Sequence, residues 1–185
     1  PSGDDGVLAN MRRSYSTKEF NGITDNIRKK LGEDVHLSTD LLVGFPGEDE
    51  KAFENSIRFI KDIGFGKMHI FNYSPREGTA AAHMACPPEN EVKQRLAKAL
   101  TEADALHRNY CSKWIGKDVE ILVEQKINDT VRGLARNYIR VAALSENAEI
   151  GEVLHVTPQK YVNGILTSDL VSKCSPDNCE FPEFL

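Results

Sequence analysis

The stretch DLLVGFPGED, residues 40–49, joins a short apolar run to a tight turn and then to an acidic segment that suits a helix start. The unbroken apolar residues 41–43 are typical of a strand buried on both faces of a parallel sheet. Gly44 and Gly47 bracket an aromatic residue and a proline, and glycine allows both a positive φ and a close approach of backbone to a ligand. Because ligands in α/β sheets bind at the carboxyl ends of the strands, this turn is either a plain connection or one wall of a binding site.

The segments on either side of this turn alternate between helical and strand patterns. Ser16 and Glu19 form a capping box, and apolar residues then recur at helical spacing until Gly32. The predicted helices span about residues 16–31, 53–63 and 89–114, and the predicted strands span residues 36–43 and 67–72. With short loops between the elements, this order predicts βα units around a parallel sheet.

From Gly116 onward the pattern changes to a period of two. Val119, Ile121 and Val123 alternate with Asp118, Glu120 and Glu124, and the turn pair Asn163-Gly164 precedes a last apolar run. Short strands at this spacing predict a small antiparallel β-barrel of the OB-like type. We therefore expect an α/β region over residues 1–115, the β-barrel over residues 116–171 and a flexible polar tail over residues 172–185.

Composition and charge argue against a nonspecific nucleic-acid-binding protein and against a membrane protein. The chain has 185 residues, of which 40% are hydrophobic and 28% charged, and its net charge is −5. The negative charge argues against nonspecific binding of nucleic acid by the whole chain but is compatible with a local basic face. The sequence has no apolar run long enough to cross a bilayer and no recognisable signal segment. We therefore expect a cytoplasmic protein that makes no contact with a membrane.

The four cysteines are Cys86, Cys111, Cys174 and Cys179, and none of them forms a Cys-x2-Cys pair. This spacing indicates neither a zinc site nor a disulfide framework, so we expect no metal ligand among the residues of this chain. Cys174 and Cys179 lie in the predicted tail, where free thiols are the simplest expectation.

Two candidate binding loops follow the two predicted strands. Thr39 to Glu48 contains the opening turn, and Asn72 to Thr79 offers a phenol, hydroxyl groups and the guanidinium of Arg76. A guanidinium binds a carboxylate or phosphate through two parallel hydrogen bonds. The alternatives are a connecting turn for the first segment and a solvated loop for the second.

The predicted β-barrel carries basic residues around an aromatic residue, a combination typical of nucleic-acid binding. These residues are Lys126, Arg132, Arg136, Tyr138, Arg140 and Lys160. Acidic residues are interspersed with them, so the alternative is a solvated surface of mixed charge.

Three motifs, taken in order, resemble a known family. Residues 2–15, SGDDGVLANMRRSY, look like the stretch SGS-x3-L-x2-M-x-R-x-Y. Residues 39–48, TDLLVGFPGE, and residues 71–81, FNYSPREGTAA, are similar to TD-x-IVGFPGE and F-x-YSPR-x-GT-x-A. This is the pattern of the radical-SAM tRNA methylthiotransferases. The Arg76-Glu77 pair and Met68-His69 look most like the threonylcarbamoyladenosine branch, and residues 116–171 take the place of the TRAM domain.

The resemblance implies an enzyme that adds a methylthio group to a modified adenosine next to the anticodon. Such enzymes use S-adenosylmethionine and two [4Fe–4S] clusters, and the partner implied for the TRAM-like barrel is the tRNA anticodon arm. The resemblance further implies that the cofactor is bound by Ser2, Gly3, Thr39, Asp40, Gly44, Phe45, Pro46, Gly47, Glu48, Tyr73, Ser74 and Arg76.

One departure from the family pattern bears on activity. The cluster motif Cys-x3-Cys-x2-Cys is absent from this sequence, and reductive cleavage of S-adenosylmethionine requires a cluster held by thiolates. We therefore expect a carboxy-terminal fragment, comprising the end of a partial parallel (β/α) barrel and the TRAM domain, that contains no catalytic residue and is inactive alone. A truncated barrel also exposes a strand edge, so we expect self-association. The alternatives are an RNA-binding module on an α/β scaffold without catalysis and an unrelated α/β enzyme.

Overall fold

The computed structural model describes residues 1–169 and the backbone of residues 171–173. Contacts divide the chain into two compact units, Pro1–Tyr110 and a second that begins at Cys111. The first two residues of the predicted tail, Ser172 and Lys173, belong to a strand, and residues 174–185, with Cys174 and Cys179, lie outside the described residues.

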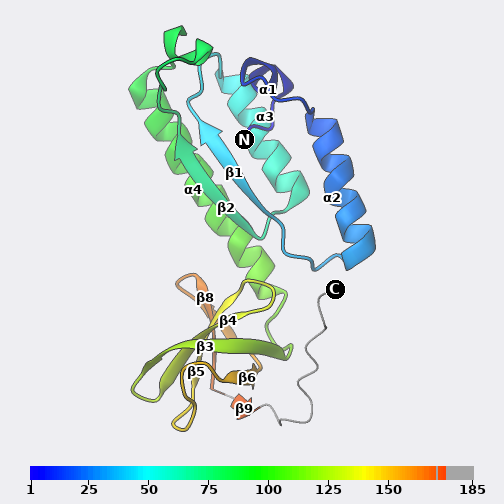
Figure 1. Ribbon diagram of the computed structural model, residues 1–185, viewed down its shortest axis with the longest axis vertical. Coiled ribbons are helices and arrows are strands. Elements are labelled where there is room, and N and C mark those ends of the chain that lie inside the picture. Colours follow the sequence, from blue (N-terminus) through cyan, green and yellow to red (C-terminus); the bar gives the residue numbers. More distant parts are fainter. Residues whose placement is uncertain (170, 174–185) are drawn as a thin grey trace. The chain divides into compact units, whose positions relative to one another are not determined.

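The first unit has the predicted α/β class, which is thereby confirmed (Figure 1). Its elements are α1 (Asp5–Asn10), α2 (Thr17–Leu31), β1 (Ser38–Val43), α3 (Glu50–Ile63), β2 (Lys67–Asn72), the 3-10 helix η1 (Ala80–His83) and α4 (Glu89–Ser112). Strands β1 and β2 are parallel, in register from Ser38 opposite Lys67 to Val43 opposite Asn72, and α3 connects them. Figure 1 shows α1 and η1 at the end of this unit toward which both strands point.

Local sequence signals account for the ends of the helices. The capping box of α2 is present, with Ser16 accepting a hydrogen bond from the Glu19 amide. Asp49 caps α3, and Gly64 ends it in the left-handed conformation. Helix α1 was not predicted because its six residues are too few to show a helical period. Helix α4 ends at Ser112, two residues before the predicted end.

One face of the β1–β2 sheet is buried beneath helices. Leu41 and Val43 of β1 belong to the same apolar core as Ile60 of α3 and Ala99 of α4. Complete burial of an aliphatic side chain of this size contributes about 1.5–3 kcal/mol, so this core positions the strands and their carboxyl ends. Asp40 and Leu42 lie on the other face of the sheet, next to β2 residues that include Phe71, whose side chain is 51% exposed.

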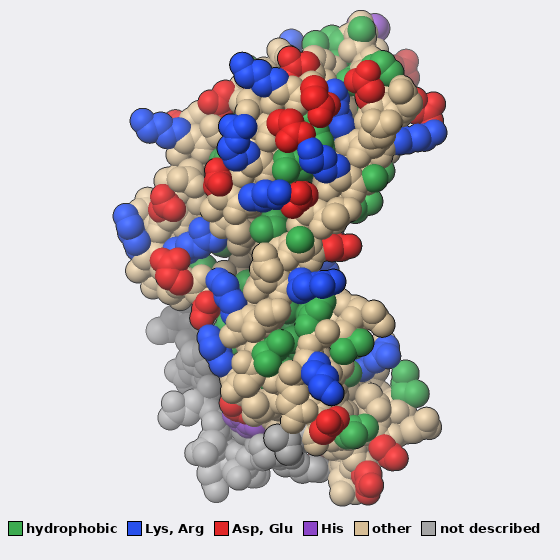
Figure 2. Space-filling model, turned by 180° about the vertical axis from the view of Figure 1, so that it is seen from behind, with side chains coloured by type: hydrophobic (Ala, Val, Ile, Leu, Met, Phe, Trp, Pro, Cys, Tyr) green, Lys and Arg blue, Asp and Glu red, His purple; other side chains and the backbone are tan. Residues whose placement is uncertain are grey.

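Charged side chains cover the outer surfaces of the helices. Lys61 of α3 pairs with Glu102 of α4 at 2.6 Å, and Lys98 of α4 pairs with Glu54 of α3. Figure 2 shows basic and acidic side chains interspersed over the rear of this unit. Exposed pairs of this kind contribute little each, so the apolar core rather than surface charge holds α3 and α4 together.

The second unit is a seven-stranded sheet, with strand order β7-β8-β5-β4-β3-β6-β9. Its strands are β3 (Val119–Ile127), β4 (Thr130–Ala135), β5 (Arg140–Leu144), β6 (Val153–Val156), β7 (Lys160–Val162), β8 (Ile165–Ser168) and β9 (Val171–Lys173). Five of its six strand pairs are antiparallel, as predicted, but β5 and β8 pair in parallel. Strands β6 and β7 lie between β5 and β8 in the sequence. The chain therefore comes back to the edge of β5 in β8, which runs in the same direction as β5.

In the second unit, the sequence correctly predicted the turn between β7 and β8 but did not reveal strand β4. Asn163 and Gly164 have φ of 48° and 87° between β7 and β8, which confirms the predicted hairpin turn. Strand β4 was missed because Gly133 interrupts its apolar alternation. A Cβ at this glycine would lie 2.5 Å from the backbone oxygen of Leu122, so close strand approach requires glycine there.

Among the described residues, no helix combines the length and the apolar character needed to cross a bilayer.

Replacement of Gly133 by alanine is expected to lower the free energy of unfolding of the second unit by about 1–3 kcal/mol, because the added methyl meets backbone that cannot move aside. Urea denaturation of the chain measures this change. The control is Gly22→Ala in α2, where an added Cβ meets nothing within 4 Å and alanine stabilises the helix by up to about 1 kcal/mol. Equal stability of the Gly133→Ala variant and the wild type would contradict the expectation.

Candidate functional site

A cleft of about 820 Å³ opens at the carboxyl ends of β1 and β2. Five of the predicted cofactor-binding residues line it, namely Asp40, Phe45, Tyr73, Ser74 and Arg76. They come from the end of β1, the following turn and the loop after β2, so parallel pairing brings together residues more than 25 positions apart. A cleft of this volume lies within the range of ligand pockets, about 300–1,000 Å³. The cofactor role of these residues stays a prediction.

The two glycines of the turn after β1 are required by the conformation and packing of the turn itself. Gly44 and Gly47 have φ of 80° and 85°, a region that other residues rarely adopt. A Cβ on Gly44 would lie 2.8 Å from the Val92 side chain of α4. The turn thus requires glycine for its shape and for its approach to a helix. Its Phe45 ring packs edge-on against Tyr73, with ring centroids 5.1 Å apart.

Glu48 points into the protein and closes the same turn. Its Oε2 accepts a hydrogen bond from the Gly44 amide at 2.7 Å, and its side chain is 1% exposed. Arg95 of α4, itself 5% exposed, donates from Nη1 to the Glu48 backbone oxygen at 2.8 Å and lies 3.5 Å from the Glu48 carboxylate. Burial raises the pKa of the Glu48 carboxyl, while the Gly44 hydrogen bond and the charge of Arg95 oppose that shift. Glu48 is therefore an internal brace of the turn and does not line the cleft.

The remaining predicted cofactor residues lie away from the cleft lining. Ser2, Gly3 and Thr39 line a separate cavity of about 20 Å³, which has room for about one water molecule. Ser2 Oγ lies 3.1 Å from Ser56 Oγ, and the Gly3 amide donates to Ser56 Oγ at 2.9 Å. These contacts anchor the start of the chain on α3. Pro46 is buried in the turn, and Gly47 is exposed.

Sequence reasoning missed part of the cleft. Arg12 and Arg13, which follow α1, also line it. Their only signal in the sequence was their place inside the MRRSY motif, and nothing local indicates that a segment 60 residues before the β2 loop reaches the same cleft. Within residues 1–169, the Tyr73 hydroxyl is a buried polar atom with no hydrogen-bond partner. An unpartnered buried hydroxyl in the wall of a cleft fits a polar ligand there.

Several basic residues predicted to bind RNA in the second unit are already paired with acids. Arg136 lies 2.7 Å from Glu120, and Arg140 lies 3.2 Å from Glu124. Lys126 donates to the Glu146 backbone oxygen at 3.0 Å and lies 3.3 Å from the Glu149 carboxylate. Arg132, Tyr138 and Lys160 are exposed, Tyr138 by 65% and with φ of 60°. The outer face is therefore of mixed charge, and its RNA-binding role stays a prediction.

The described cysteines do not fit an iron–sulfur cluster. Cys86 is exposed in the first unit and Cys111 is buried in the second. Burial raises the pKa of the Cys111 thiol to about 11, which disfavours the thiolate that a cluster needs. In the part of the chain that the structure describes, no group of three or more His, Cys, Asp or Glu side chains is arranged to hold a metal ion.

The chain is similar to several proteins whose names all describe methylthiolation of tRNA. No protein-family model matches the chain. A tRNA-2-methylthio-N(6)-dimethylallyladenosine synthase of Endomicrobium trichonymphae is 32% identical over 171 residues, 92% of this chain and 41% of the relative. The protein of the same name from Leifsonia xyli is 44% identical over 125 residues, 66% of this chain and 23% of the relative.

The name of a third relative specifies a different substrate. A threonylcarbamoyladenosine tRNA methylthiotransferase of Bacillus subtilis is 32% identical over 161 residues, 84% of this chain and 36% of the relative. The chain thus spans less than half the length of the curated relatives it matches.

Replacement of Arg95 by methionine is expected to lower the free energy of unfolding by about 3–5 kcal/mol at pH 8, because Glu48 is left as a buried, uncompensated charge. Loss of the cation raises the already elevated pKa of Glu48 further. A raised pKa in the folded state means that the folded protein binds the proton more tightly than the unfolded chain, so stability falls as pH rises through that pKa. The loss should therefore be smaller at pH 5 than at pH 8.

Urea denaturation at the two pH values measures this difference. The double variant Arg95→Met, Glu48→Gln serves as the control, because it removes the buried charge together with its partner and should recover part of the stability at pH 8. An equal loss for Arg95→Met at pH 5 and pH 8 would show that Glu48 is not the group responsible.

Proposed function

Since this chain belongs by homology to the tRNA methylthiotransferase family, we propose that it is the carboxy-terminal part of an enzyme that adds a methylthio group to a modified adenosine next to the anticodon. The relatives' names give two such adenosines, one with a dimethylallyl and one with a threonylcarbamoyl substituent. Because the substrate is tRNA, we expect the enzyme in the cytoplasm. The observation that carries the proposal is the cleft at the carboxyl ends of β1 and β2, lined by residues of three family motifs.

In this proposal the cleft binds S-adenosylmethionine next to the target base. When bound, one molecule of S-adenosylmethionine would supply the radical on one-electron reduction, and a second molecule would supply the methyl group. The Asp40 carboxylate, exposed on the open face of the sheet, is placed to accept hydrogen bonds from ribose hydroxyls or from an ammonium group. The Phe45 and Tyr73 rings, in edge-on contact, form an apolar wall, and Arg76 orients a carboxylate or phosphate.

Among the residues that the structure describes, no set of side chains offers an iron–sulfur cluster site. The cysteine motif of the family is absent from the sequence, and the two described cysteines are one exposed and one buried. We accordingly propose that this chain does not catalyse methylthiolation by itself. Its contribution is to bind and orient the cofactor and the base.

The second unit is proposed to hold the anticodon arm. Arg132 and Arg140, from neighbouring strands β4 and β5, are exposed, and exposed arginines bind the phosphates of RNA. The second candidate function is an RNA-binding module without catalysis, which the same residues would serve. Binding of S-adenosylmethionine separates the two, because only the enzyme needs it.

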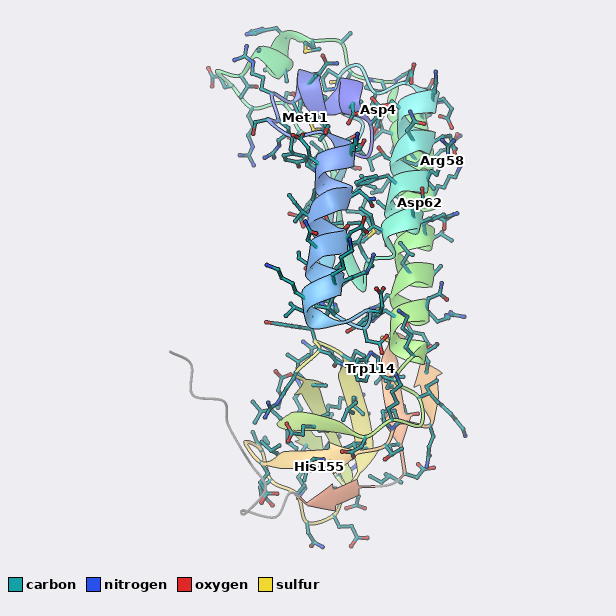
Figure 3. All side chains as sticks on the ribbon, turned by 90° about the vertical axis from the view of Figure 1, so that its right-hand side faces the viewer. Asp4, Met11, Arg58, Asp62, Trp114 and His155 are labelled. Atoms are coloured by element: carbon teal, nitrogen blue, oxygen red, sulfur yellow. The ribbon has the colours of Figure 1, made fainter. Side chains whose placement is uncertain are left out.

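Isothermal titration of S-adenosylmethionine into the chain tests the cleft assignment. Replacement of Asp40 by asparagine is expected to weaken binding about tenfold, because a charge-assisted hydrogen bond is lost. The matched control is Asp62→Asn, since Asp62 is an exposed acid on α3 outside the cleft (Figure 3). Equal affinity of the Asp40→Asn variant and the wild type would remove Asp40 from the site, and no binding by the wild type would favour the RNA-binding module.

Binding of a tRNA anticodon stem-loop should weaken steeply with salt, as expected for phosphate contacts. Arg140→Ala and Arg136→Ala are each expected to lower the affinity a few-fold and to reduce the salt slope by about one unit. Fluorescence anisotropy at several salt concentrations measures both quantities, with Arg58→Ala on α3 as the control. No change in either variant would exclude these two arginines from the RNA interface.

A further inference from the structure

The cleft carries an excess of positive charge. Its lining includes three arginines, Arg12, Arg13 and Arg76, and one acid, Asp40. All three arginines are exposed. Among the interactions described for residues 1–169, none gives these guanidinium groups an ion-pair partner. Unpaired guanidinium groups that line a concave site favour an anionic ligand.

Arg12 and Arg13 project from a segment whose backbone is fixed. The Arg12 amide donates to the Ala9 oxygen and the Arg13 amide to the Leu8 oxygen, each at 2.9 Å. Val7 and Leu8 of α1 are each 1% exposed and hold the segment to the core. Arg12 has φ of 55°, a left-handed conformation that residues other than glycine rarely adopt and that often marks a functional position. Figure 3 shows the neighbouring Met11 at the α1 end of the first unit, while Arg58 lies along α3.

The two substituents in the relatives' names differ in charge. A dimethylallyl group is an uncharged hydrocarbon, whereas a threonylcarbamoyl group ends in a free carboxylate. When an unpaired guanidinium group packs against a hydrocarbon, it loses hydrogen bonds to water and gains no new partner, which is unfavourable. A carboxylate provides that partner through charge-assisted hydrogen bonds.

We propose that Arg12, which stands at the variable position of the family stretch M-x-R-x-Y, recognises the carboxylate of an N6-threonylcarbamoyl substituent and so determines which modified adenosine this cleft accepts. The inference rests on the proposed function, because it takes the cleft as the substrate site. It goes further in naming the substituent and the residue that selects it. Arg76 remains available for the cofactor or for phosphate.

A phosphate of the RNA backbone is the other anion that these arginines would bind, so the test uses nucleosides, which contain no phosphate. Three ligands are titrated into the 185-residue chain: N6-threonylcarbamoyladenosine, its carboxylate methyl ester, and N6-dimethylallyladenosine. The free acid is expected to bind about tenfold more tightly than the ester, because the ester keeps the shape and loses the charge. The dimethylallyl nucleoside should bind no more tightly than the ester.

Variants then assign the effect to the arginine. Arg12→Ala should lower the affinity for the free acid about tenfold, to that of the ester, and leave the affinity for the ester unchanged. Arg12→Lys should retain part of the preference, because it keeps the charge without the planar fork. Arg58→Ala, an exposed arginine outside the cleft, should behave as the wild type.

The inference is overturned if acid and ester bind equally, if the dimethylallyl nucleoside binds most tightly, if Arg12→Ala weakens all three ligands alike, or if none of the nucleosides binds. Titration of S-adenosylmethionine into the same samples separates this failure from failure of the proposed function. Cofactor binding without a preference for the acid rejects the inference alone. A preference for the acid without cofactor binding supports recognition of the carboxylate and rejects the cofactor assignment of the cleft.

Discussion

The contact between Arg95 and the turn that follows β1 is the interaction on which the rest of the first unit depends. Arg95 reaches from α4 to the backbone oxygen and the carboxylate of Glu48, and it also lies within 3.4 Å of Glu50. Glu48 in turn holds the Gly44 amide. A nearly buried guanidinium needs all of these acceptors, because an unpaired charge inside a protein is costly. One side chain therefore fastens a helix, a turn and the end of a strand together.

This brace has a direct consequence for the cleft. With Glu48 turned inward, the turn presents Phe45 toward Tyr73 and leaves Asp40 on the open face of the sheet. Gly44 permits the turn to lie against α4, where a side chain at this position would collide with Val92. Some residues of this motif thus stabilise the turn, and others line the cleft. A match to the motif does not show which residue has which role.

Elements with strong local signals were predictable, and those without them were not. The capping box at Ser16, the left-handed Gly64 and the hairpin turn at Asn163 each depend on neighbours within a few residues. The short helix α1 and the glycine-interrupted β4 lack a period long enough to detect. The ion pair between Arg136 and Glu120 could not be predicted from the sequence either, because it joins side chains from different segments of the chain.

The sequence by itself determined the order of the longer helices and strands, the turn chemistry and the family, because these are carried by local pattern and by motifs that can be matched residue by residue. Only the tertiary structure decided which motif residues face the cleft. It buried Glu48 beneath Arg95, 47 positions away, and brought Arg12 to the same cleft as Arg76. The physical reason is that burial and charge pairing depend on contacts between distant segments, and those contacts exist only once the sheet and helices have packed.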